Sequence, residues 1–409
     1  MSRHFVKASA LAICMTLSAG CGAEGGSPTP SPSPIATPSP TPSPSPTPAP
    51  TSGPALPRLA AGPHLGMITG FEPLDTDRAT IAAERYQEAR DAGATIGRVQ
   101  IDWSELETAP GQYNETALDE AFDRPELEGM NLVVLVSTLD SDGLTLPAYL
   151  MDDGELRDGL TLDAPEVRDA FESFLEWLTP RLMSRDVWLL SIGNEVIGPI
   201  EDGLVSEEQA VGFYTAAFDQ WNESVPDIGI TLTFTIRAPD GIPSLFNALR
   251  QRGDIVTFNY YCLDGNITVT GPTDWERRLA KMKQDAGSQE IFFQELGCPV
   301  GYGPSGASSS IGGSLENQTA FFQYFGDQFA NDPQLRAATL FQLYDWSPEL
   351  AASFSEPLAG AGFPVIADRL EEWLATVGVV RWSDQTNRPA WEEWLNANRK
   401  VAYARRQSQ

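Results

Sequence analysis

Between residues 64 and 343, short apolar runs rich in β-branched residues alternate eight times with longer amphipathic stretches. Such runs are typical of buried parallel strands. The expected strands are His64–Ile68, Thr95–Ile101, Asn131–Ser137, Val187–Ile192, Gly229–Thr235, Asp254–Tyr260, Glu290–Glu295 and Ala338–Leu343. Helical periodicity lies between them, for example over Arg78–Ala92, Pro165–Arg185, Ser206–Glu223, Asp274–Ala286 and Glu316–Ala330. The pattern predicts an α/β fold, a single (β/α)8 TIM barrel.

The structural rival is an open, doubly wound sheet. No Gly-x-Gly-x-x-Gly follows the first expected strand, as that fold would have if it bound a dinucleotide. The length of residues 58–402 is also normal for one barrel. We therefore expect one folded domain over these residues.

The first twenty residues have a basic start, an apolar stretch and then small residues, which is the pattern of a secretory signal. Cys21 follows, and Leu-Ser-Ala-Gly-Cys resembles a bacterial lipoprotein processing site, in which the cysteine is acylated. Leu17 stands four residues before Cys21, one further than usual. The alternative is ordinary cleavage nearby with an incidental cysteine. We expect an exported protein, lipid-anchored in the cell envelope (periplasmic or at the cell surface) or secreted.

Residues 21–57 form a linker rich in proline, serine and threonine. Proline occupies 13 of the 31 positions from Ser27 to Pro57. Such a segment favours extended polyproline II and acts as a semi-rigid spacer. It would hold the folded domain away from a membrane.

The chain is strongly acidic, with a formal net charge of −29. Loss of residues 1–20 removes Arg3 and Lys7 and no acid, so the mature chain is more acidic still. This charge argues against a nucleic-acid partner and against any membrane contact other than the lipid anchor. A neutral or cationic substrate stays open, although such a surface can also serve solubility alone.

The chain has only two histidines, His4 and His64, and His4 lies in the expected signal. We expect no metal site and no cofactor, because one histidine cannot build a multi-histidine centre. A serine triad is not expected either, because no Gly-x-Ser-x-Gly elbow is present. We therefore expect carboxylates to carry any catalytic chemistry.

Two glutamates end expected strands, Glu195 after the fourth and Glu295 on the seventh. A carboxylate is costly to bury, so one at the end of an apolar strand has a task or a partner. The carboxyl ends of barrel strands line the active site. Hydrolysis of a glycosidic bond needs one carboxyl to protonate the leaving oxygen and another to attack or to activate water. The alternative is a pair of structural ion pairs with arginine.

At these positions the sequence resembles the clan A glycoside hydrolases, the superfamily of retaining barrels that includes family 5. Asn194-Glu195 matches the Asn-Glu pair at the end of strand four, and Glu295 matches the strand-seven nucleophile. The stretch from Arg98 through Trp103, followed by Pro-Gly-x-Tyr-Asn and Leu-Asp, resembles the strand-two pattern of such barrels. The resemblance implies that Glu195 is the acid/base, Glu295 the nucleophile and Asn194 a ligand of the sugar 2-hydroxyl.

Further substrate-binding positions follow from the same resemblance. Arg98 would keep the nucleophile ionised, and Tyr261 fits the tyrosine that hydrogen-bonds to it. Asn259 stands where family 5 enzymes often carry histidine, which departs from that family's pattern. Trp346, after strand eight, matches an aromatic platform beneath the scissile sugar. Each of these side chains has a structural alternative, in packing or charge neutralisation.

Cys262 and Cys298 lie just beyond the ends of neighbouring strands, in a compartment where disulfides persist. Their proximity predicts a disulfide, and two buried thiols are the alternative.

The sequence thus predicts a monomeric retaining glycoside hydrolase that cleaves a β-linked oligo- or polysaccharide. The rival is an inactive carbohydrate-binding lipoprotein on the same barrel.

Overall fold

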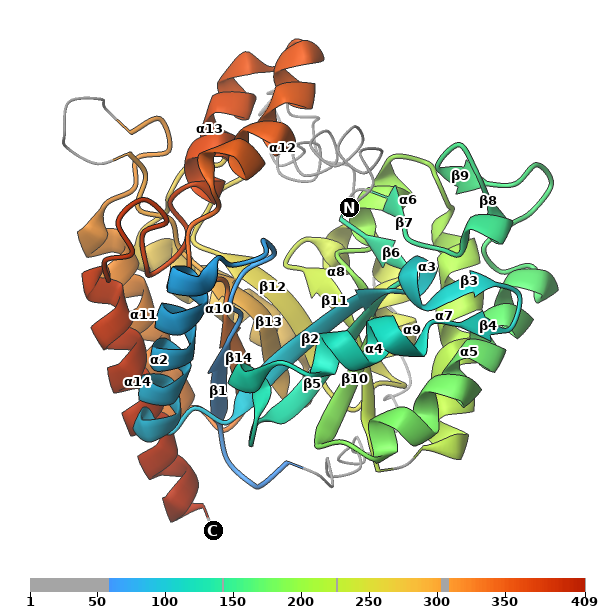
Figure 1. The fold of residues 1–409 in the computed structure, drawn as a ribbon, viewed down its shortest axis with the longest axis horizontal. Coiled ribbons are helices and arrows are strands. Elements are labelled where there is room, and N and C mark those ends of the chain that lie inside the picture. Colours follow the sequence, from blue (N-terminus) through green and yellow to red (C-terminus); the bar gives the residue numbers. More distant parts are fainter. Residues whose placement is uncertain (1–58, 142, 226, 303–308, 409) are drawn as a thin grey trace, which may run out of the picture.

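The barrel predicted from the sequence is present. The structure is a computed structural model and describes residues 59–408 except 142, 226 and 303–308, so the signal, Cys21 and the linker lie outside the described residues. Eight parallel strands close in the order β1-β14-β13-β12-β11-β10-β5-β2 (Figure 1). They are β1 (His64–Met67), β2 (Ile96–Asp102), β5 (Asn131–Ser137), β10 (Val187–Asn194), β11 (Gly229–Thr235), β12 (Val256–Tyr261), β13 (Ile291–Gly297) and β14 (Leu335–Leu340).

Seven strands agree with the predicted bounds to within two residues, and the eighth does not. Its predicted span, Ala338–Leu343, lies three residues too late, because β14 begins at Leu335 and ends at Leu340. Gln342 has a left-handed backbone with φ 72°, which is incompatible with an extended strand. The apolar run continues past the strand end, so composition alone placed the strand too far along.

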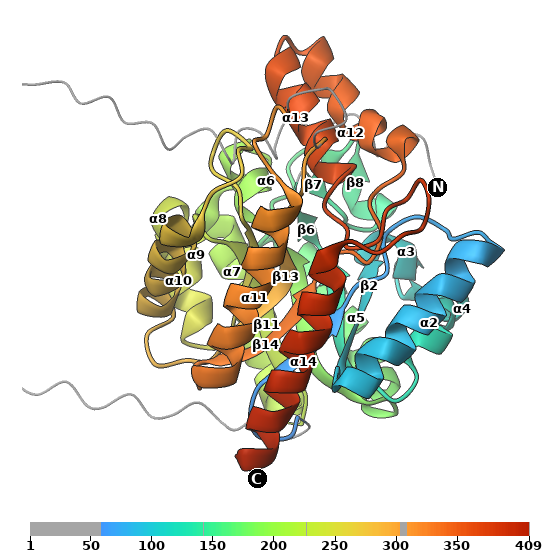
Figure 2. The same cartoon turned by 90° about the vertical axis from the view of Figure 1, so that its left-hand side faces the viewer.

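Helices cover the outside of the barrel (Figure 1), and the long carboxyl-terminal helix α14 packs beside α11 (Figure 2). Their apolar faces are buried against the strands, whereas their outer faces are charged. Among the residues that the structure describes, no helix is long and apolar enough to span a membrane. The covering helices are α2 (Thr76–Ala92), α4 (Glu115–Phe122), α5 (Pro165–Met183), α7 (Glu207–Ser224), α9 (Pro243–Arg250), α10 (Pro272–Ala286), α11 (Leu315–Asn331) and α14 (Pro389–Gln407).

Short elements surround the carboxyl ends of the strands. Three two-stranded sheets follow β2 and β5. Their strands are β3 (Glu107–Ala109) with β4 (Gln112–Tyr113), β6 (Leu139–Asp140) with β7 (Gly143–Leu144), and β8 (Met151–Asp152) with β9 (Glu155–Leu156). The short helices at this end are α3 (Trp103–Leu106), η2 (Ala148–Leu150), α6 (Ile197–Glu201) and α8 (Ala238–Gly241), whereas η1 (Pro125–Leu127) precedes β5 at the amino end of that strand.

A helical hairpin stands above the mouth of the barrel, after β14 (Figure 1). It consists of α12 (Pro348–Gly360) and α13 (Pro364–Leu374). An apolar cluster joins it to the ends of β1 and β14 and to the loops after β12 and β13, through residues that include Ile68, Leu263, Ile311, Phe341, Trp346 and Trp373. The hairpin was not predicted from the sequence, and it forms one wall of the mouth.

Candidate active site

The fourth barrel strand delivers Asn194 and Glu195 to the mouth through a local irregularity. The register between β10 and β11 shifts between Ser191 and Asn194. Gly193 lies within this shift, and a Cβ there would come within 2.7 Å of the Tyr214 hydroxyl, so only glycine fits. Glu195 follows with φ 47°, a left-handed conformation that is costly for a residue other than glycine. The Glu195 carboxyl thus lies at the barrel mouth although the backbone conformation of this residue is energetically unfavourable.

Asn259 connects the two glutamates. It is opposite Glu295 in the register of β12 and β13. Its amide nitrogen donates to Oε1 of Glu195 at 2.9 Å and to Oδ1 of Asn194 at 3.0 Å. The sequence-predicted residues of the fourth, sixth and seventh strands therefore meet in one cluster.

Glu295 lies between a buried cation and a phenol. The Arg98 guanidinium donates to its Oε1 at 2.6 Å, and the two side chains are only 1% and 6% exposed. The Tyr261 hydroxyl donates to its other oxygen. Burial, together with the charges of Glu295 and Glu195, raises the pKa of Tyr261 well above its usual value, so the phenol stays protonated as a donor. Both oxygens of the Glu295 carboxyl therefore have a donor.

Glu195 has a different environment. The residue is half-buried, and its carboxyl accepts hydrogen bonds from Asn259 and, at 3.2 Å, from the Ser141 hydroxyl. Removal of the carboxyl from water, followed by repulsion from Glu295, raises the pKa of Glu195 to about 7. Glu295 is thus paired with a cation, whereas Glu195 retains a proton near neutral pH. Two carboxyls in such different environments can take separate roles in acid and base chemistry.

Further polar residues of the site were missed in the sequence analysis. Asp140 accepts from the Asn194 amide at 2.9 Å and from Ser137 at 2.7 Å, and it contacts Ser141. Gln294 donates to the Asn194 side-chain oxygen at 3.3 Å. Asp140 and Ser141 lie three and four residues after the end of the third barrel strand, so a search a few residues beyond each strand end would have found them.

The predicted platform, Trp346, lies in the mouth but is only 7% exposed. Phe71 and Phe354 pack edge-on against its ring, with centroid distances of 5.8 and 4.8 Å. A second tryptophan, Trp373 of α13, approaches Tyr261 at a centroid distance of 5.0 Å. No sequence motif marked Trp373, because its position depends on how the hairpin folds back over the barrel.

A groove of about 750 Å³ opens from Glu195. Its inner part is lined by Asn259, Tyr261 and Trp373, and its outer part by α8 and α10. The volume is within the range of small-ligand sites. In the described part of the chain, no group of three or more histidine, cysteine or acidic side chains is arranged to hold a metal ion.

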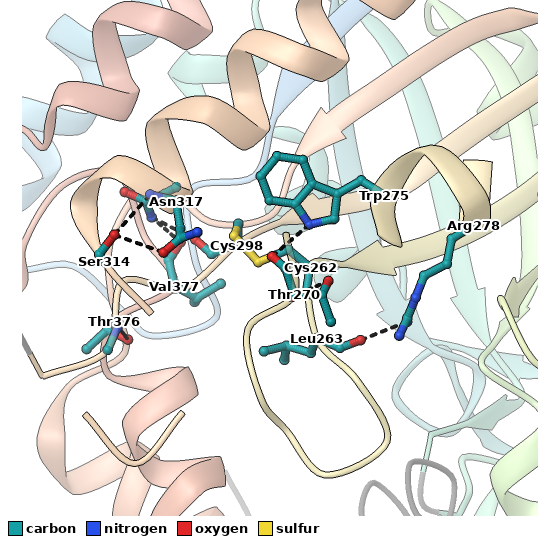
Figure 3. Close-up of a disulfide and its surroundings, with 12 residues drawn as sticks. Cys262, Leu263, Thr270, Trp275, Arg278, Cys298, Ser314, Asn317, Thr376 and Val377 are labelled. Carbon is teal, nitrogen blue, oxygen red and sulfur yellow. Dashed lines mark hydrogen bonds between the residues drawn. A yellow bond between two sulfur atoms is a disulfide. The ribbon is translucent and has the colours of Figure 1, made fainter. Parts of the chain in front are cut away.

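Cys262 and Cys298 lie beside the site at disulfide distance, with Cα atoms 5.0 Å apart (Figure 3). Both side chains are fully buried. Nearby, the Trp275 indole donates to the Thr270 carbonyl at 2.9 Å, and Arg278 donates to the Leu263 carbonyl at 2.8 Å (Figure 3). The loop after β12 is therefore held to the loop after β13 and to α10.

His64 lies at the amino end of β1, at the opposite end of the barrel from the glutamates. It is 1% exposed, and its ring nitrogens contact the Thr95 hydroxyl at 2.7 Å and the Ala60 carbonyl at 2.9 Å. Burial lowers the pKa of His64 to about 3. It is a core histidine.

No protein-family model matches this chain, and no curated protein sequence matches it. Solved structures share its fold. GH5_18 from Streptomyces cattleya, in complex with GlcNAc, is 18% identical with a TM-score of 0.63, over 84% of this chain and 81% of that chain.

Two further structures resemble the chain to a similar degree. GH5_18 from Bifidobacterium longum subsp. infantis is 15% identical, with a TM-score of 0.58, over 84% and 79% of the two chains. The exo-β-1,4-mannosidase Op5Man5 from Opitutaceae bacterium strain TAV5 is 12% identical, with a TM-score of 0.59, over 87% and 63%. At these identities the likeness establishes the fold.

Proposed function

We propose that this protein is a retaining glycoside hydrolase that cleaves a β-linked oligo- or polysaccharide. The observation that carries the proposal is the unequal pair of carboxyls at one mouth. Glu295 is held by Arg98 and Tyr261, whereas the pKa of Glu195 is raised to about 7. A double displacement needs one ionised nucleophile and one protonated acid.

The reaction then follows from the contacts. Glu295 attacks the anomeric carbon while Glu195 gives its proton to the leaving oxygen, so a covalent glycosyl intermediate forms on Glu295. Glu195, now ionised, takes a proton from water, and the oxygen of that water displaces the sugar from Glu295. Asn194 is the ligand of the sugar 2-hydroxyl in this proposal. Its amide has a fixed orientation, because it donates to Asp140 and accepts from Gln294 and Asn259. Trp346 is the platform beneath the sugar.

Three of the structural neighbours indicate which substrates to test first. Variants of GH5_18 from Streptomyces cattleya and from Bifidobacterium longum were solved with Manβ1-4GlcNAc, and Op5Man5 is an exo-β-1,4-mannosidase. We therefore propose β-1,4-mannosides as the first class in a panel that also includes β-glucosides, β-galactosides and β-xylosides.

We further propose that the enzyme is a monomer exported to the cell envelope, with the signal in residues 1–20 and a lipid on Cys21. The disulfide between Cys262 and Cys298 belongs to the same proposal, because an exported protein folds in an oxidising compartment. The proline-rich linker would give the barrel access to substrates beyond the membrane surface.

Glu295→Gln tests the function. An enzyme should lose about 10⁴-fold or more in kcat, because no nucleophile remains. The matched control is Glu290→Gln, at the amino end of the same strand, where Glu290 pairs with Arg336 at 3.4 Å; its activity should stay within about twofold. Proton NMR of the first product should show the β anomer if the configuration is retained.

The same panel distinguishes the rival function. A wild-type protein that binds a polysaccharide without hydrolysing it, with unchanged affinity in Glu295→Gln, would contradict the enzyme and favour the carbohydrate-binding lipoprotein.

A further inference from the structure

The groove beside Glu195 lies on the side where the leaving group must leave. In the proposed reaction Glu195 protonates the oxygen of the departing sugar, so that sugar lies next to Glu195 and away from Glu295. The groove is lined by Glu195 but not by Glu295 or Arg98, and it extends outward to Arg237, Asp240 and Lys281. Tyr261, the hydrogen-bond partner of Glu295, lines its inner end, so the groove begins at the reacting centre and leads away from it past Glu195, as a site for the leaving group would.

Trp373 contributes one edge of the apolar surface of this groove, since its side chain lies mostly in the apolar cluster and the residue is 7% exposed. It is the tryptophan among the lining residues, and it stands beside Tyr261 on the wall formed by α13. Its indole nitrogen is buried and has no hydrogen-bond partner among the described residues. A sugar presents C–H faces that stack on an indole, and its hydroxyls can accept from the indole N–H.

The outer rim of the groove consists of paired charges. Arg237 bonds to Glu201 at 2.6 Å, and Lys281 contacts Asp240 at 3.3 Å. Besides Glu195, the lining contains four basic and three acidic side chains, in a chain with 27 basic and 56 acidic residues. Because the charges already have partners, the rim suits the donors and acceptors of a neutral sugar better than an ionised group.

Hydrogen bonds of both neighbouring residues hold the segment around Trp373. The carboxylate of its neighbour Glu372 accepts from the amides of Tyr302 at 2.6 Å and Ser310 at 2.7 Å. The Leu374 carbonyl accepts from the Trp346 amide at 3.1 Å. A surface fixed before the ligand arrives costs little ordering entropy on binding.

We propose that Trp373 is the stacking surface for the leaving-group sugar, and that the paired charges of α6, α8 and α10 bind its hydroxyls. This inference rests on the proposed glycoside hydrolase function. Specificity for a neutral sugar leaving group would then depend on the helix α13 and not on the strands that carry the catalytic carboxyls.

The test compares two reactions of the same enzyme. One is hydrolysis of β-1,4-linked disaccharides of mannose, glucose and xylose. The other is inactivation by the 2-deoxy-2-fluoro-β-glycosyl fluoride of the same sugar, which traps a retaining nucleophile and whose fluoride leaving group cannot stack. The variants are Trp373→Ala and Trp373→Phe. Trp382→Ala is the control, because Trp382 contacts Arg78 and does not line the groove.

For Trp373→Ala we expect kcat/KM on the best disaccharide to fall about 30-fold, while the inactivation rate stays within about threefold. Trp373→Phe should recover most of the loss, and Trp382→Ala should change neither reaction by more than about threefold. An equal loss in both reactions would overturn the inference, because Trp373 would then only support Tyr261. No loss on the disaccharide would also overturn it. A wild-type protein that is inactive in both reactions would overturn the proposed function and this inference with it.

Discussion

At the scale of single residues, the proposed role of Glu195 predicts that glycosidase activity depends on pH in one direction. Its pKa of about 7 means that the protonated acid needed in the first step disappears as the pH rises. We expect kcat/KM to fall about tenfold per pH unit above pH ~7, and Glu195→Gln to lose this alkaline limb. A pH profile on a disaccharide, whose leaving group needs a proton, measures the limb in the wild type, and a substrate with an activated leaving group keeps Glu195→Gln active enough for its own profile. Activity that rises through pH 9 would contradict the acid role.

Arg98 and Glu295 form a buried ion pair whose partners depend on each other. Arg98→Met leaves the carboxylate with no cation in a buried site, so we expect a loss of about 3–5 kcal/mol in the free energy of unfolding. Adding Glu295→Gln should recover much of this loss, since the unpaired charge is then gone. Urea unfolding provides the measurement.

The control for Arg98 is an exposed pair. Arg157 and Glu166 are 45% and 56% exposed, so Arg157→Met should cost less than about 1 kcal/mol. Equal losses at Arg98 and Arg157 would mean that burial of the Arg98–Glu295 pair has no energetic importance.

At the scale of elements, the loops after β12 and β13 depend on Cys262 and Cys298. The two cysteines are 36 residues apart, and a loop of this size corresponds to about 3–4 kcal/mol of stabilisation by a disulfide. We expect the double variant Cys262→Ser/Cys298→Ser to unfold at a lower temperature. Reductant should lower the Tm of the wild type and leave that of the double variant unchanged.

Mass spectrometry of an unreduced digest checks the same bond directly. A linked pair of peptides containing Cys262 and Cys298 is expected. Two alkylated free thiols would reject the bridge and support the alternative of buried cysteines.

The strands show how much of the secondary structure could be predicted from the sequence. A strand buried on both faces must be an apolar run, so Asn131–Ser137 and Gly229–Thr235 match their predictions to the residue. The end of β14 does not match its prediction, because apolar residues continue beyond Gln342, where the backbone turns. Periodicity encodes which face is buried, whereas a strand end depends on local backbone conformation.

At the scale of the whole molecule, the signal, Cys21 and the linker predict where the protein is located. If Cys21 is acylated, the wild type should sediment with membranes and Cys21→Ser should be soluble after export. Fractionation with blotting measures this, and activity of the released variant on a soluble substrate serves as the control. Equal partition of both proteins would contradict the lipid anchor.

The sequence by itself determined the barrel and the positions of Glu195 and Glu295 at its mouth, because apolar runs and the acidic residues that follow them are local features of the chain. Tertiary structure alone decided that Asn259 lies between the glutamates, that Asp140 and Gln294 hold Asn194, and that Trp373 faces the groove. The physical reason is distance along the chain. These contacts join residues of separate strands and of α13 that meet only after the barrel closes. The raised pKa of Glu195 arises from the burial and charge that this closure creates.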